Sequence, residues 1–202
     1  MLNLWNRIIT TGIIYPALAV FFKFLENITF LGLIRYVFIR RLRFRWYILY
    51  SQLAVDLYVL FWFATELAVF LYPFTSLVIT RVFSYIYIWR IVDIVQSWFN
   101  VTVRPPYQST PPRALTLVLL NYIEIILIFT VIIFSFQDNF FHRPIYMYNA
   151  FFSSVSVIIP MVDPVITPLT LTGLAIYYGE IALGLIFLIV IIQRTVALFS
   201  HK

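Results

Sequence analysis

Residues 150–168 read AFFSSVSVIIPMVDPVITP, an apolar run that contains one acid and ends in a segment with three prolines. Residues up to Ile159 include no helix breaker, whereas Pro160, Pro164 and Pro168 each lack a backbone N–H and fix φ near −65°. Proline also disfavours helical geometry in the residue before it, so we expect Ile159 and Asp163 to be extended. The stretch therefore predicts a short helix followed by an extended segment.

The composition of the whole chain is that of a polytopic membrane protein. Its 202 residues are 63% hydrophobic and only 11% charged, and the mean hydropathy is +0.96. A soluble domain is nearer half apolar and a quarter charged. The chain has no cysteine, so disulfides and thiolate metal sites are excluded. The sequence predicts no cofactor and no bound metal.

Four segments are long enough to cross a bilayer, which takes about 20 mostly apolar residues. They are residues 47–72, 74–100, 113–136 and 169–198, whereas residues 145–159 fit a re-entrant helix and residues 8–39 an interfacial helical hairpin. The predicted fold is an all-α membrane protein with four transmembrane helices, a re-entrant pore helix and an N-terminal interfacial helical region. The predicted parts are an anchoring region (1–46), an antiparallel helix pair (47–104), a non-helical Pro-rich linker (105–112) and a pore-like domain (113–202).

A cluster of arginines next to the first long helix predicts the orientation. Basic residues mark cytoplasmic loops and attract anionic lipid headgroups, so this cluster is interpreted as a lipid anchor and the net charge of +6 does not indicate nucleic acid. Counting crossings then places residues 137–168 outside and the carboxyl terminus in the cytoplasm. The cluster consists of Arg35, Arg40, Arg41, Arg43 and Arg45.

Charged residues inside the predicted helix pair need partners, because unpaired charge in a membrane is costly. If the two helices are antiparallel around a turn at Pro73, equal rise per residue predicts the ion pairs Glu66 with Arg81 and Asp56 with Arg90. Asp93 could share Arg90. These residues are interpreted either as structural pairs or as a reduced voltage sensor, since the two arginines fit a three-residue repeat.

Residues 113–199 resemble the pore domain of potassium channels. Aligned without a gap to the family's filter region, the chain matches at framework positions, and Phe152 stands where the family has an aromatic residue. Glu180 and Gly184 resemble a polar residue and a hinge glycine of small bacterial two-helix channels. The resemblance implies a homotetramer in a bacterial plasma membrane. The matching framework positions are Ala150, Ser154, Val155, Ile166, Thr167 and Pro168.

The filter itself departs from that family. Where the family has T-T-V-G-Y-G-D, this chain has Ile159, Pro160, Met161, Val162, Asp163, Pro164 and Val165. Potassium selectivity needs inward backbone carbonyls, which depend on glycine at two positions held here by Val162 and Pro164. We therefore expect potassium selectivity to be lost. Asp163 is interpreted either as one carboxylate of a ring that favours cations or as a hydrogen-bonding loop residue.

Two acids lie at mid-depth of the predicted pore helices with no cation level with them in that half. Glu180 is interpreted either as a cation-binding or proton-sensitive group of the cavity or as a carboxyl hydrogen-bonded within the helix bundle, and for Glu124 the second interpretation is favoured. The partners then considered are Asn121, Tyr122, Tyr177 and Tyr178. Gly179 and Gly184 fit either a hinge or close helix packing.

The functional prediction is a tetrameric pore that is either non-potassium-selective or a nonselective cation pore. The alternative is a non-conducting channel homologue that serves as a structural or regulatory subunit with other membrane proteins. An enzyme is not expected, because the sequence has no metal-ligand spacing, no nucleophile beside a histidine and no Gly-rich phosphate loop.

Overall fold

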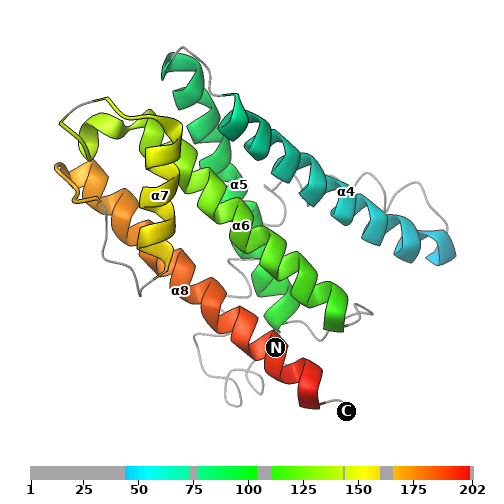
Figure 1. Ribbon diagram of the computed structural model, residues 1–202. Coiled ribbons are helices and arrows are strands. Elements are labelled where there is room, and N and C mark those ends of the chain that lie inside the picture. Colours follow the sequence, from blue (N-terminus) through cyan, green and yellow to red (C-terminus); the bar gives the residue numbers. More distant parts are fainter. Residues whose placement is uncertain (1–43, 73–76, 104–110, 143, 160–165, 201–202) are drawn as a thin grey trace, which may run out of the picture. The chain divides into compact units, whose positions relative to one another are not determined.

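The computed structural model describes residues 44–72, 77–103, 111–142, 144–159 and 166–200 (Figure 1). All regular structure within these ranges is helical, which confirms the all-α prediction. Each of the four predicted long segments and the short one contains a helix. They are α4 (Phe44–Leu71), α5 (Leu77–Val103), α6 (Pro111–Ser135), α7 (Met147–Ile158) and α8 (Leu171–Ser200), with a 3-10 turn, η1 (Gln137–Asn139), after α6.

Three helices of the described ranges are long and apolar enough to cross a membrane: Leu53–Leu71, Leu115–Ser135 and Leu171–Gln193. The chain is therefore an integral membrane protein by length and composition. The fourth predicted span, α5, is helical but less apolar, because Arg81, Arg90 and Asp93 are distributed along it.

Helix α6 begins at Pro111, inside the linker that was predicted to be non-helical over residues 105–112. That prediction is wrong for Pro111 and Pro112. Proline is tolerated in the first turn of a helix because the backbone N–H groups there have no intrahelical partner. Residues 104–110 lie outside the described residues, and so does the predicted anchoring region up to residue 43, which holds four of the five arginines of the predicted cluster. The fifth, Arg45, lies in the first turn of α4.

Contacts divide the chain into two compact units, residues 1–56 with 92–106 and residues 57–91 with 107–202. In the second unit α6, α7 and α8 all contact one another (Figure 1); we call residues 111–200 the α6–α7–α8 module. A division at the Pro-rich linker stays a prediction. The centre of the module is an apolar cluster of Ile133, Phe140, Ala150, Val157 and Ile166.

Helix α7 has clear physical boundaries at both ends. At its start the backbone N–H of Tyr146 donates to Oδ1 of Asn149 at 3.2 Å, half of the reciprocal bonding that caps helix N-termini. At its end Ile159 is extended, with φ −92° and ψ 100°. Pro160 follows and disfavours helical geometry at Ile159, as the sequence predicted.

Candidate functional site

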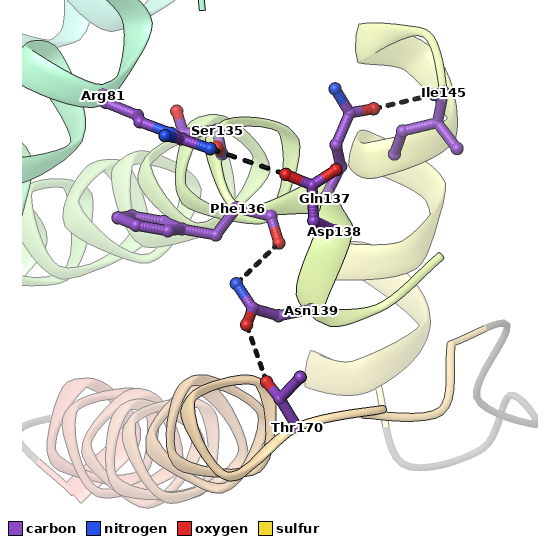
Figure 2. A network of polar contacts seen from close by, with 8 residues as sticks. All are labelled: Arg81, Ser135, Phe136, Gln137, Asp138, Asn139, Ile145 and Thr170. Carbon is purple, nitrogen blue, oxygen red and sulfur yellow. Dashed lines mark hydrogen bonds and ion pairs between the residues drawn. The ribbon is translucent and has the colours of Figure 1, made fainter. Parts of the chain in front are cut away.

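The corner between α6 and α7 is organised by polar side chains of η1 (Figure 2). Gln137 is buried and its Oε1 accepts the backbone N–H of Ile145 at 2.8 Å, which fixes the entry into α7. Nδ2 of Asn139 donates to the carbonyl of Phe136 at 3.1 Å. We call this corner, residues 135–141, the η1 end of the module. A polar Gln-Asp-Asn run directly after an apolar helix is the sequence signal that could have predicted it.

The same corner also holds the start of α8. Oγ1 of Thr170 donates to Oδ1 of Asn139 at 2.7 Å (Figure 2), and the N–H of Leu169 donates to the Asn139 carbonyl at 2.8 Å. Gly173 lies so close that a Cβ on it would be 2.6 Å from that carbonyl oxygen. The close approach of backbone to backbone therefore requires glycine at this position.

The other end of α7 lies beside the middle of α8. A Cβ on Gly184 would be 3.3 Å from Cγ2 of Ile158, and Gly184 is near the middle of the 30-residue helix α8. With 12 residues, α7 is only about 18 Å long at 1.5 Å per residue. Gly184 is thus a close-packing position, whereas a Cβ on Gly179 would meet nothing within 4 Å.

A hydrogen bond links α7 to α8 at this level. Oγ of Ser154 donates to Oε1 of Glu180 at 2.5 Å, and it also lies 3.1 Å from the carbonyl oxygen of Ile126 on α6. Glu180 is fully buried within the chain. Glu180 thus bonds to a serine of α7, and among the described residues none of the four partners considered from the sequence takes that place. A role in a cavity or gate stays a prediction.

A buried ion pair connects α5 to α6. Nη2 of Arg90 donates to Oε2 of Glu124 at 2.6 Å, and both side chains are 1% exposed or less. The guanidinium also lies over the rings of Tyr58 and Trp62, at 4.9 Å and 6.0 Å from their centroids. The partner favoured for Glu124, an uncharged side chain of its own half, is wrong. Counting levels within one helix pair could not find a cation from a third helix.

Glu66 of α4 belongs to the same buried region. It is fully buried, and it interacts electrostatically with both Arg90 and Glu124. Neither of its carboxylate oxygens has a hydrogen-bond partner among the described residues. We call Glu66, Arg90 and Glu124 the charge centre.

The predicted pair between Glu66 and Arg81 is wrong. Arg81 bonds at the η1 end, where its Nε donates to the carbonyl of Ser135 at 3.2 Å and its Nη2 lies 3.5 Å from Oδ2 of Asp138 (Figure 2). The prediction assumed that the charged residues of α4 and α5 pair with one another. Arg81 is instead half-exposed and bonds to a carbonyl and a carboxylate group just after the apolar part of α6. The predicted pairing of Asp56 and Asp93 with Arg90 stays a prediction, because these acids and Arg90 belong to different compact units.

The filter-like segment is described only at Ile159, which is 39% exposed; residues 160–165 lie outside the described residues. On the far side of that segment Ile166 is buried in the module core. Among the described residues no group of three or more His, Cys, Asp or Glu side chains could hold a metal ion.

No family model, no curated protein and no solved structure matches this chain. The resemblance to the potassium-channel pore domain therefore stays a prediction that rests on the sequence of residues 113–199 alone.

Proposed function

We propose that the chain is one subunit of a tetrameric membrane pore that conducts cations without potassium selectivity. The observation that carries this proposal is the half-length helix α7. It starts at the η1 end of the module, beside Gln137, and ends beside the middle of α8, a helix long enough to cross a membrane. In this proposal α7 is a re-entrant pore helix, α6 is the outer helix and α8 the inner helix.

The segment that follows α7 needs either water or protein around it if it lies at membrane depth. Residues 166–170 are not helical, and Ile159 is extended. Unpaired backbone groups at membrane depth are tolerated only where protein buries them or water solvates them. The prolines at 160 and 164 are incompatible with a continuous helix through this segment. A pore axis shared by several subunits meets this requirement.

One face of α7 is available for a neighbouring subunit. Tyr148 and Phe152 are one helical turn apart and are 54% and 61% exposed, whereas the opposite face packs on α6 and α8. In the proposed tetramer this aromatic face contacts the next copy. Aromatic side chains are enriched in the cores of such interfaces.

The proposed selectivity follows from the residues in place of the filter. Val162 and Pro164 stand at the two positions where potassium coordination needs glycine, so a dehydrated potassium ion has no preferred site. Asp163, repeated in four copies, would supply a ring of carboxylates that favours cations over anions.

The experiment is a conductance measurement on purified protein in planar bilayers with unequal KCl and NaCl solutions, at several voltages and pH values. We expect cation currents whose reversal potential does not distinguish potassium from sodium. Asp163→Asn should lower the cation-to-anion permeability ratio. Asp138→Asn is the matched control, because it removes an exposed acid from the η1 end without touching the filter-like segment.

Two results would overturn the proposal. A monomer or dimer by mass measurement in mild detergent contradicts the tetramer. A tetramer that carries no current under any condition contradicts the pore, and it favours the alternative of a non-conducting subunit.

A further inference from the structure

The charge centre combines two acidic side chains with one basic side chain. Glu66 on α4, Arg90 on α5 and Glu124 on α6 are each 1% exposed or less. Arginine is always protonated in proteins. If both acids were ionised, one negative charge would therefore remain without a counter-charge in a site that excludes water.

Neither of the other two arginines whose side chains are described in this unit neutralises that charge. Arg81 is 45% exposed and bonds to Ser135 and Asp138 at the η1 end. Arg113 lies in the first turn of α6, about 16 Å along the helix from Glu124 at 1.5 Å per residue. Three aromatic side chains of α4 and α5 also lie at the centre: Tyr58, Trp62 and Tyr87. Of these only the tyrosines titrate, and neither contributes positive charge.

The oxygens of the two acids also require a hydrogen-bond donor. Both carboxylate oxygens of Glu66 and Oε1 of Glu124 are buried and have no hydrogen-bond partner among the described residues. An unpaired buried carboxylate costs several kcal/mol even after relaxation, on the order of a whole protein's net stability of about 5–15 kcal/mol. A ligand that removes one charge and supplies one donor neutralises the centre and joins two of these three oxygens by a hydrogen bond.

We propose that the charge centre binds one proton, which Glu66 and Glu124 share while Arg90 holds the remaining charge. The proton turns one carboxylate oxygen into an O–H donor, and the other acid offers the accepting oxygen. Two carboxylates in one site are stable in this singly protonated form, because their like charges oppose full ionisation. A metal ion fits less well, since calcium takes 6–8 oxygen ligands. The proton site does not depend on conduction by the proposed pore.

The first test is infrared spectroscopy of the protein in lipid vesicles at neutral pH. We expect a carbonyl-stretch band of a protonated carboxyl group that disappears in Glu66→Gln, an uncharged replacement that keeps the shape of the protonated acid. Glu180→Gln is the matched control, because Glu180 is equally buried but bonds to Ser154 on another helix. A band that is the same in wild type and in Glu66→Gln would overturn the proposal.

The second test counts protons during unfolding and does not need Glu66→Gln to fold. An unfolded glutamate is ionised at neutral pH, with an ordinary pKa of about 4.3. Unfolding the Glu180→Gln protein with sodium dodecyl sulfate in weakly buffered solution should therefore release one proton per chain. The unfolding equilibrium constant should then rise about tenfold per pH unit around neutrality. Unfolding without proton release, or with no such pH dependence, would contradict a bound proton.

Discussion

The charge centre and the η1 end use the same kind of interaction, an arginine of α5 with an acid near or on α6, in opposite environments. The Arg90–Glu124 pair is almost completely buried at 2.6 Å, whereas the side chains of Arg81 and Asp138 are 45% and 81% exposed at 3.5 Å. Breaking a buried ion pair is costly because it leaves one charge buried without a counter-charge. Exposed charges that lose their partner are solvated by water instead. The centre should therefore determine stability, and the η1 end should mainly determine geometry.

The strongest way to break this comparison is Glu124→Gln, which leaves the Arg90 guanidinium buried without its carboxylate. We expect a loss of about 3–5 kcal/mol in the free energy of unfolding, measured by denaturant titration in mixed micelles. The matched control is the double variant Arg90→Met with Glu124→Leu. It removes both charges and should recover most of the loss, because apolar replacements of buried pairs are often neutral or stabilising.

A loss below about 1 kcal/mol for Glu124→Gln would contradict this estimate. It would mean that Glu66, which already interacts with Arg90, takes over as the counter-ion.

The hydrogen bond between α7 and α8 should have an intermediate effect on stability, because a neutral hydroxyl there donates to a buried acid. Ser154→Ala removes the hydroxyl that donates to Glu180. We expect a loss of about 1–3 kcal/mol in unfolding free energy, the usual cost of leaving a buried polar group unsatisfied. Ser153→Ala is the matched control, because Ser153 is equally buried on the same helix and its hydroxyl has no hydrogen-bond partner among the described residues. Equal losses in the two variants would show that the bond to Glu180 contributes nothing.

These buried contacts also separate what the sequence could predict from what it could not. Apolar length and proline positions predicted the helices, and Pro160 correctly predicted an extended Ile159 at the end of α7. Those features depend on the local chain alone. The partners of Glu124 and Arg81 depend on which helices become neighbours, and a count of levels within one hairpin carries no such information. The prediction of a non-helical linker was wrong at the two prolines that start α6, because the first turn of a helix tolerates proline.

The geometric role of the η1 end can be sharpened with glycine. Gly173→Ala would place a methyl group 2.6 Å from the Asn139 carbonyl oxygen. We expect a cost of about 1–2 kcal/mol from overpacking, measured as the unfolding free energy in micelles. Gly179→Ala is the control on the same helix with open space around it, and it should stabilise by up to about 1 kcal/mol through helix propensity. The two variants should thus change stability in opposite directions, and a gain in both would contradict the close approach.

The smallest effect is expected at the exposed pair. Asp138→Asn removes the carboxylate beside Arg81, but the guanidinium keeps its bond to the Ser135 carbonyl and its position 5.9 Å from the centre of the Phe136 ring. Exposed ion pairs contribute about 0–1 kcal/mol, and salt screens them further. The loss in unfolding free energy should therefore stay below about 1 kcal/mol and vanish in concentrated salt. A salt-independent loss as large as that of Glu124→Gln would show that burial does not distinguish the two arginines, and the proposed difference between the charge centre and the η1 end would be wrong.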